Sequence, residues 1–361
     1  MFEDIIQAAK TDSAQGPQKT ISDAIAPTPA ENEAVRIAVI GVGGAGCNCV
    51  NRMVKNGLKS AVAIAVNTDS KHLKITEAHR KILIGKNITK GLGAGGSPEL
   101  SKKCAEADLE LLKKEIGENE LVFICAGMGG GTGTGATPTI ARVAKEQGAI
   151  VIAMVTYPFN IERSRLRIAQ SGIRELVGIA DTVVVIDNNR LLAYAPNLPL
   201  NQAFELADSI TSHAVMGISD TIMFPSLMNV DFADVKAVMQ NGGIAFISIG
   251  EGNGHDKVQN VIKNTLEHPL LDVDYEGAKG GLLHIEGGAD LTLGDAISIG
   301  NGITSSFDEN ASVKVGARIN PELKNAVRVT SIVVGVKSPM MLKREDSGGI
   351  VHLTDEDLSG L

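Results

Sequence analysis

The segment 129–135, GGGTGTG, is the part of this sequence that points most directly to a ligand. It consists only of glycine and threonine, follows an apolar run that suits a β-strand, and precedes a helical pattern. Glycine loses more conformational entropy on folding than any other residue, so a run this dense indicates that something approaches the backbone very closely. Packing of a helix on a sheet would not need so many glycines.

A second glycine-rich loop, GVGGAG at 41–46, also lies between a predicted strand and a predicted helix. It satisfies the dinucleotide fingerprint through Gly41, Gly43 and Gly46. A dinucleotide site needs one such loop, whereas two loops at neighbouring strand ends can wrap a longer polyphosphate. Neither loop carries the lysine of a P-loop. The phosphate charge would then be met by backbone amides, helix N-termini and Mg²⁺, with Thr132 and Thr134 as hydroxyl donors or metal-shell groups.

The elements that must position these loops are an alternation of strands and helices. Short β-branched apolar runs typical of fully buried strands occur at 36–42, 61–68, 81–85, 121–127, 149–158 and 181–188. Between them lie helical patterns such as 97–117, with Ser97 as N-cap, Pro98 in the first turn and Gly117 as the stop. Repeated βαβ units predict a doubly wound parallel sheet, an α/β fold whose ligands bind beyond the carboxyl ends of the strands.

The second half of the chain changes character after a long helical stretch at 201–223. Strand-like and helical runs between 243 and 338 predict a second, smaller α/β domain joined to the first through this central helix. We expect a flexible N-terminal tail over 1–35, followed by a nucleotide-binding domain with the central helix over 36–223. A loop and connecting helix over 224–242 would lead to a C-terminal α/β domain over 243–338 and a flexible C-terminal tail over 339–361.

Composition excludes several classes of function. The net charge of −8, the aromatic content of 3% and the absence of tryptophan argue against a nucleic-acid partner. No apolar run of about 18 residues and no secretory leader pattern is present, so we expect a cytoplasmic protein without direct membrane insertion. The four cysteines have no metal or disulfide spacing, which fits a reducing compartment. The histidines have no metal-ligand spacing.

Several long motifs, in this order along the sequence, resemble those of the FtsZ family of prokaryotic cell-division GTPases. These motifs are GVGGAGCN, NTD at 67–69, GLGAGGSPE, GGGTGTG, PFNIE, NN at 188–189 and NVDFADV, and the resemblance covers about residues 36–340. It implies a tubulin/FtsZ-like protein that binds GTP or GDP with Mg²⁺. It further implies head-to-tail polymerisation with itself into the ring at mid-cell, together with division-site and membrane-tether proteins. An arginine at position 163, where bacterial members usually have glycine, and the absence of the bacterial tether peptide lean toward an archaeal member.

The resemblance also implies a set of nucleotide-binding residues. The phosphates would be held by the two glycine loops, and the γ-phosphate would also contact a small-residue loop at 91–96. Glu162 would lie near the ribose, Asn188 would contact the nucleotide, and an arginine would reach it. We choose Arg165 for that arginine, with Arg163 and Arg167 as alternatives. The loop positions are Gly43, Gly44, Ala45, Asn48, Ala94, Gly95, Gly129, Gly130, Gly131, Thr132, Gly133, Thr134 and Gly135.

Phe204 and Asp208 are the residues expected to recognise the base. They are separated by four positions on one predicted helix, so both project to the same side. The ring can stack on a purine, and the carboxylate can accept hydrogen bonds from guanine N1–H and N2–H₂. Adenine has an acceptor at N1 and would leave the carboxylate unpaired.

Asp231 and Asp234, in NVDFADV, are the expected catalytic residues. Ionised carboxylates three apart at a helix start can orient a water for attack on a γ-phosphate, although an exposed helix-capping pair has the same spacing. The resemblance implies that this loop acts in the site of the next subunit.

Two other classes of function remain open. A dinucleotide oxidoreductase built on the first glycine loop would use Asp69 for the ribose, but leaves 129–135 unexplained. A tubulin-like scaffold would bind GTP without hydrolysing it, against which the intact acidic pair argues.

Overall fold

The computed structural model describes residues 35–190, 197, 199–224, 228, 230–240, 243–267, 275–321 and 323–336. The tails predicted for the two ends of the chain lie outside the described residues, except for Val35.

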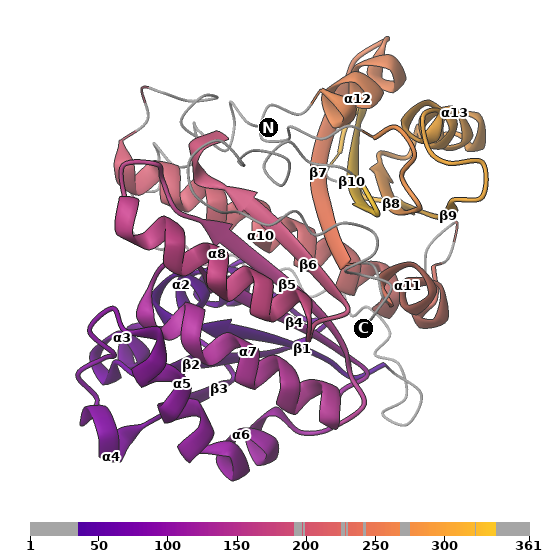
Figure 1. Ribbon diagram of the computed structural model, residues 1–361. Coiled ribbons are helices and arrows are strands. Elements are labelled where there is room, and N and C mark those ends of the chain that lie inside the picture. Colours follow the sequence, from indigo (N-terminus) through magenta and orange to yellow (C-terminus); the bar gives the residue numbers. More distant parts are fainter. Residues whose placement is uncertain are drawn as a thin grey trace, which may run out of the picture.

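The predicted run of buried strands forms the first half of a sheet. Its order is β3-β2-β1-β4-β5-β6, and every neighbouring pair is parallel. The strands span Ile37–Val42 (β1), Val62–Asn67 (β2), Arg80–Leu83 (β3), Leu121–Gly127 (β4), Ile150–Tyr157 (β5) and Thr182–Asp187 (β6). β1 and β4 are buried over almost their whole length because helices cover both faces (Figure 1).

Each face of this sheet has its own hydrophobic core. Residues such as Val39, Phe123 and Ile152 pack against α2 and α10 on one face, whereas Ile40, Ile124 and Val151 pack against α5, α7 and α8 on the other. These helices span Gly43–Lys55 (α2), Pro98–Ala107 (α5), Gly131–Glu146 (α7), Arg163–Val177 (α8) and Leu200–Met223 (α10), and the shorter α3 and α4 span Ser70–Ile75 and Lys86–Thr89.

The helix predicted over 97–117 is two helices, α5 and α6 (Leu109–Ile116). Ser97 caps α5 by accepting from the Leu100 amide at 3.2 Å, and Gly117 ends α6 with φ +67°, both as predicted. The break falls at Asp108, whose carboxylate accepts from the Gly85 amide at 2.6 Å. Short polar side chains that bond to backbone elsewhere compete with helix continuation, which the apolar periodicity did not reveal.

The second domain extends the same sheet. β7 (Gly243–Asn253) pairs in parallel with β6 over three residue pairs, and the order continues β7-β10-β8-β9. β10 (Ala326–Val334) is antiparallel to β7 and β8, whereas β8 (Gly280–Gly287) and β9 (Ser312–Ile319) are parallel. Helices α12 (Lys257–Leu266) and α13 (Leu293–Thr304) lie over these strands (Figure 1). The predicted fold class, two α/β domains joined through a long helix, is confirmed.

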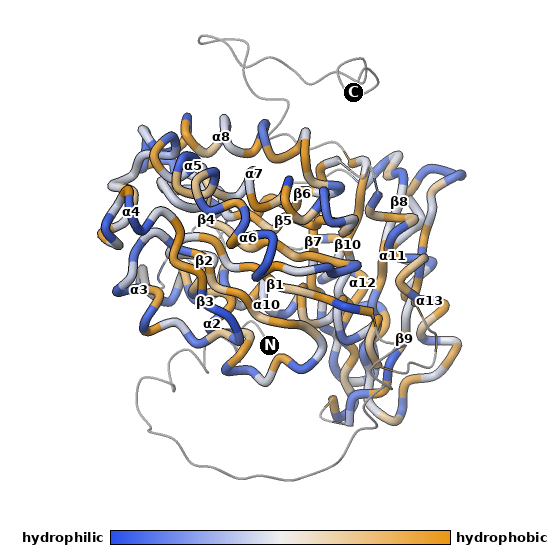
Figure 2. Tube along the Cα trace, turned by 90° about the horizontal axis from the view of Figure 1, so that it is seen from below, coloured by the Kyte–Doolittle hydropathy of each residue, from blue (hydrophilic) through white to orange (hydrophobic). Residues whose placement is uncertain are grey.

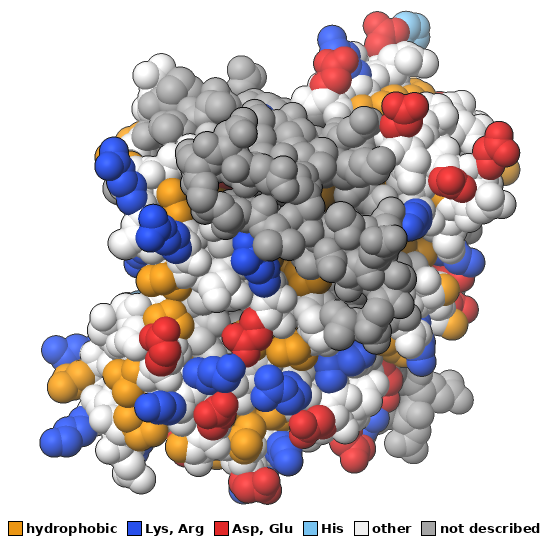
Figure 3. Space-filling model, in the orientation of Figure 1, with side chains coloured by type: hydrophobic (Ala, Val, Ile, Leu, Met, Phe, Trp, Pro, Cys, Tyr) orange, Lys and Arg blue, Asp and Glu red, His pale blue; other side chains and the backbone are white. Residues whose placement is uncertain are grey.

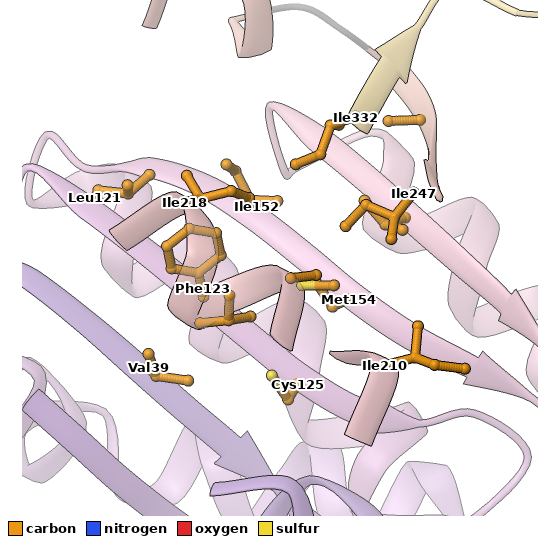
Figure 4. Close-up of a cluster of buried hydrophobic side chains, with 14 of the residues drawn as sticks. Val39, Leu121, Phe123, Cys125, Ile152, Met154, Ile210, Ile218, Ile247 and Ile332 are labelled. Carbon is orange, nitrogen blue, oxygen red and sulfur yellow. The ribbon is translucent and has the colours of Figure 1, made fainter. Parts of the chain in front are cut away.

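Helix α10 joins the two halves of the molecule by packing on both. Ile210 and Ile218 from this helix lie in one cluster with Phe123 of the first domain and with Ile247 and Ile332 of the second (Figure 4). In Figure 2 hydrophobic segments follow the central strands, while hydrophilic segments concentrate on the outer helices. Burial of apolar surface against one helix therefore fixes the domains relative to each other.

The face in view in Figure 3 carries acidic and basic side chains interspersed rather than in one patch. No helix among the described residues is long and apolar enough to cross a membrane.

Candidate nucleotide site

A cavity of about 460 Å³ lies at the carboxyl ends of β1, β4, β5 and β6, where the doubly wound topology predicts a ligand. Its wall combines residues from both glycine loops with residues that follow β5 and β6 and residues from the first turns of α10. The lining residues are Val42, Gly44, Ala45, Asn48, Gly127, Met128, Gly130, Gly131, Thr132, Gly133, Thr156, Pro158, Glu162, Arg165, Asn188, Phe204, Ala207 and Asp208.

The glycines of the loops divide into two kinds. Gly44 and Gly130 face open space: a Cβ at Gly44 would meet nothing within 4 Å, and one at Gly130 would come no closer than 3.9 Å to another atom. In contrast, a Cβ at Gly133 would lie 2.4 Å from the Gly127 carbonyl oxygen. Gly133 thus lets the loop fold tightly, while Gly44 and Gly130 leave backbone accessible to a ligand.

The N-termini of two helices face this cavity, so the positive ends of their dipoles are directed at it. α2 begins at Gly43 and α7 at Gly131, so the first turn of each is formed by loop residues. Neither of these fully described helices has an acidic residue in its first turn or a side-chain cap. Their first amides remain for an anion, and each helix start carries about half a positive charge. The arrangement suits a polyphosphate.

The two threonines of the loop have different roles. Thr132 lines the cavity, and its Oγ1 lies 2.7 Å from Oγ1 of Thr68, just beyond the end of β2. Thr134 is buried and accepts a hydrogen bond from the Gly129 amide at 2.9 Å. Thr132 therefore faces the ligand space, whereas Thr134 shapes the loop.

The two residues predicted to recognise the base lie on the cavity wall. Phe204 is 42% exposed and meets Phe159 edge to face, with ring centroids 5.6 Å apart. Burial raises the pKa of Asp208 to about 7; nearby Arg52 acts against this shift and Glu205 adds to it. The Asp208 carboxyl therefore changes its charge near neutral pH, and its ionised form can accept hydrogen bonds from a ligand.

A third group of polar residues closes the cavity near the start of α8. Arg165 donates to the Glu162 carboxylate, and both residues line the wall, whereas Arg163 and Arg167 do not. Asn188 is 5% exposed, and its Oδ1 has no hydrogen-bond donor among the described residues. A buried acceptor without a partner, aimed into a ligand cavity, fits a group supplied by the ligand.

Six predicted residues are not on this wall: Gly43, Ala94, Gly95, Gly129, Thr134 and Gly135. Gly135 allows α7 to pack on α5, because a Cβ there would lie 2.0 Å from the Pro98 carbonyl oxygen. Ala94 and Gly95 belong to the loop before α5, which reaches the second glycine loop where Gly96 approaches Gly131. These residues support the wall from behind or beside it.

Six residues on the wall were not predicted: Val42, Gly127, Met128, Thr156, Pro158 and Ala207. Five of them lie in or beside predicted loops or strand ends, and the strand-end rule could have found these. Ala207 lies one residue before Asp208 on the same helix face as Phe204, which a helical projection could have indicated.

The acidic pair lies at the other end of the molecule. Asp231 is the N-cap of α11 (Phe232–Met239), and Asp234 completes a capping box: Asp231 Oδ1 accepts from the Asp234 amide at 2.8 Å, and the Asp231 amide donates to Asp234 Oδ2 at 3.4 Å. α11 lies at the amino end of β6, where Thr182 donates to the Met239 carbonyl oxygen at 2.7 Å. The cavity is at the carboxyl end of the same strand, beside Asn188.

The fold and the cavity together define a nucleotide-binding protein of the tubulin/FtsZ class. The Tubulin/FtsZ family GTPase domain matches residues 36–196, and the FtsZ family C-terminal domain matches residues 243–337. Cell division protein FtsZ 2 of Methanocaldococcus jannaschii is 54% identical over 86% of this chain and 82% of its own length. Cell division protein FtsZ 2 of Haloferax volcanii is 50% identical over 85% of this chain and 77% of its own length.

Among solved structures, the M. jannaschii structure described as "FtsZ dimer, empty" matches with a TM-score of 0.82 at 41% identity, covering 89% of this chain and 96% of that one. The chain belongs to the FtsZ family and is a GTPase. The similar proteins are mostly archaeal, in agreement with the sequence prediction.

The two other functional readings do not hold. An oxidoreductase would need Asp69 for a ribose, but this carboxylate caps α3 by accepting from the Lys71 and His72 amides at 2.8 and 3.2 Å. The alternative of a scaffold that binds GTP without hydrolysing it is inconsistent with membership of a GTPase family.

Proposed function

We propose that this protein hydrolyses GTP only after head-to-tail assembly with copies of itself, and that the resulting filament forms the cytokinetic ring. The names of its relatives and the description of a solved relative as a dimer support self-assembly in cell division. Division-site and membrane-tether proteins would then be its further partners, and mid-cell its place of action.

The separation of the acidic pair from the cavity carries this proposal. α10 contributes Phe204 and Asp208 to the cavity near its first residue and leads toward Asp231 after its last. From Asp208 to Met223 the helix rises by 15 residues, which is about 22 Å at 1.5 Å per residue. Asp231 and Asp234 therefore cannot reach a nucleotide in their own subunit. Stacking of subunits end to end would bring them to the cavity of the next one, and a contact of this kind that does not close makes an open filament.

Different parts of the cavity would bind the phosphates, the ribose and the base of GTP. The amides of Gly44, Gly130 and the first turns of α2 and α7 would hold the phosphates, with Thr132 beside them. Phe204 would stack on the base, and the ionised Asp208 would accept from guanine N1–H and N2–H₂. Glu162, Arg165 and Asn188 lie where the ribose and base edge would pass.

The donor set also fits a magnesium ion held mainly by the nucleotide. No cluster of His, Cys, Asp or Glu able to hold a metal occurs among the described residues, so the Thr132 hydroxyl is the protein group we expect beside the ion. When bound, Mg²⁺ neutralises charge that develops on the phosphate oxygens.

Catalysis would consist of positioning. The carboxylates of one subunit orient a water for in-line attack on the γ-phosphate in the next, while loop amides and helix N-termini stabilise the phosphate charge. Loss of the γ-phosphate removes a contact of the loop at 91–96, which lies beside the second glycine loop, and weakens the joint between subunits.

Phosphate release measured against protein concentration tests the proposal. With GTP and Mg²⁺, we expect the rate per molecule to be near zero in dilute protein and to rise steeply beyond a threshold, while ATP gives no rise. A rate per molecule that stays constant on dilution would mean that the site is complete within one chain.

Substitution of the acidic pair tests its role. We expect Asp231→Ala and Asp234→Ala to lower turnover by about a hundredfold or more, the range for a group that orients the nucleophile, because the water is no longer held. GTP affinity, measured on dilute subunits by calorimetry, should remain, since the pair lies beyond the end of α10 that is remote from the cavity. Loss of GTP binding in either variant would contradict the assignment.

A further inference from the structure

The catalytic pair has a charged neighbour on the edge strand of the second domain. Lys314 in β9 places its Nζ 2.7 Å from Asp234 Oδ1. Two residues further along, Gly316 faces the segment before α11, since a Cβ there would lie 3.0 Å from Val230. Alternate residues of a strand share a face, so Lys314 is directed at α11 by the same register that packs Gly316.

This contact makes the two carboxylates unequal. Asp234 Oδ1 is held by Lys314, and its Oδ2 accepts from the Asp231 amide in the capping box. Asp231 Oδ1 accepts from the Asp234 amide, while no donor in the described part of the chain meets its Oδ2. Asp234 is thus fixed by a side chain and by backbone, and Asp231 keeps one acceptor oxygen for another group.

The charges explain why such a neighbour matters at this place. The proposed function brings Asp231 and Asp234 toward the phosphates of the next subunit, and two carboxylates facing a polyanion repel it. The ammonium of Lys314 offsets one of these two negative charges. It also lowers the pKa of Asp234, so that this carboxyl remains ionised beside the phosphates.

We propose that Lys314 is a positioning residue of the shared GTPase site, which orients Asp234 and offsets its charge so that the acidic pair can approach the nucleotide of the next subunit. The inference rests on the proposed function, because it requires the pair to act across the contact. Stability alone is a weak reason for this ion pair. Its side chains are 36% and 28% exposed, and ion pairs in water contribute little to folding.

Three variants test the proposal. Lys314→Met removes the ammonium, Lys314→Arg keeps a cation that can reach the carboxylate, and Lys236→Met removes the same charge from an exposed position of α11. For each, we would measure GTP affinity of dilute subunits, the assembly threshold by sedimentation at several KCl concentrations, and turnover beyond the threshold.

We expect Lys314→Met to lower turnover by about tenfold, the lower end of what outer partners of functional groups contribute. GTP affinity should not change. Its assembly threshold should exceed that of the natural protein at low salt, and the difference should shrink as salt screens the added repulsion. Lys314→Arg should restore most of the turnover, and Lys236→Met should resemble the natural protein. Equal effects of Lys314→Met and Lys236→Met would overturn the inference.

The double variant Asp234→Asn/Lys314→Met separates this inference from the proposed function. If Lys314 acts through Asp234, its loss should lower turnover no further once Asp234 is Asn; an additional tenfold loss would overturn the inference. If Asp234→Asn lowers turnover and Lys314→Met alone does not, only the role of Lys314 fails. If Asp234→Asn itself leaves turnover intact, the shared acidic site fails and the role of Lys314 with it.

Discussion

At the scale of single residues, the cavity combines groups that are costly to leave without a ligand. Asp208 is a half-buried carboxylate whose pKa is raised, and Asn188 has a buried oxygen without a donor among the described residues. Groups of this kind lower the stability of the folded subunit and favour a ligand that supplies the missing hydrogen bonds. Guanine supplies two donors at adjacent positions, which is what a carboxylate can accept.

If Asp208 binds guanine as proposed, its raised pKa should make GTP binding dependent on pH. Guanine donates to the ionised form, whereas burial holds a proton on the carboxyl below its pKa of about 7. GTP affinity should therefore fall as the pH decreases through 7, by up to about tenfold per pH unit. Calorimetry on dilute protein between about pH 5.5 and 8.5 measures this dependence. Glu205→Gln should move the midpoint to lower pH because Glu205 contributes to the raised pKa, and an unmoved midpoint would contradict this origin.

A rise in pH, which should strengthen GTP binding through Asp208, should lower the contribution of the same carboxyl to the free energy of unfolding. Its folded pKa lies above the ordinary value of 3.8, so the native state holds the proton longer, and its contribution to stability is lost as the pH rises through 7. We expect Asp208→Asn to raise the melting temperature of nucleotide-free protein at pH 8, on the order of 5 °C, and to weaken GTP binding. A lower melting temperature at pH 8 would show that the charge is not a source of strain.

At the scale of elements, the glycines of the two loops serve either helix packing or access to the cavity, and the sequence motif alone does not tell which glycine serves which purpose. Gly135 brings α7 against α5, whereas Gly44 opens backbone at the start of α2 to the cavity. One is required for packing, and the other for approach of the ligand.

Two alanine substitutions should separate these purposes. Gly135→Ala forces α7 from α5 and should cost about 1–3 kcal/mol of unfolding free energy, as overpacking does. Gly44→Ala places a methyl group in open space, so the melting temperature should stay within about 2 °C while GTP affinity falls at least about tenfold. Thermal unfolding without nucleotide and calorimetry with GTP measure the two effects. Unchanged GTP affinity in Gly44→Ala would mean that the phosphates do not lie at this loop.

At the scale of the whole molecule, α10 separates the cavity from the acidic pair and packs on both domains. If the GTPase site is shared between two subunits, a variant without the acidic pair and a variant without a working cavity can complement each other. Asp231→Ala retains a nucleotide cavity, and Asp208→Ala retains an acidic pair.

Mixing these two inactive variants should restore turnover. In an equal mixture with random pairing, about a quarter of the joints would join an intact cavity to an intact acidic pair. We expect phosphate release to reach that share of the natural rate, with each variant alone as control. A mixture no more active than its components would contradict catalysis across the contact.

Much of this protein could be predicted from sequence because the information is local. Buried parallel strands appear as apolar runs, helix ends as Ser97 and Gly117, and the two loops that line the cavity as glycine. Parallel topology then brings loops at neighbouring strand ends together without knowledge of any side-chain contact. Most of the cavity wall follows from these rules and from the family resemblance.

Only the tertiary structure decided features that depend on contacts distant in sequence. The break at Asp108 depends on an amide 23 residues away, and the choice of Arg165 over its neighbours at the wall depends on how α8 is rotated. The pKa of Asp208 depends on burial, and the pairing of Lys314 with Asp234 depends on an edge strand 80 residues later. Sequence patterns record the local preferences of the chain, whereas packing of the whole molecule determines which side chains meet.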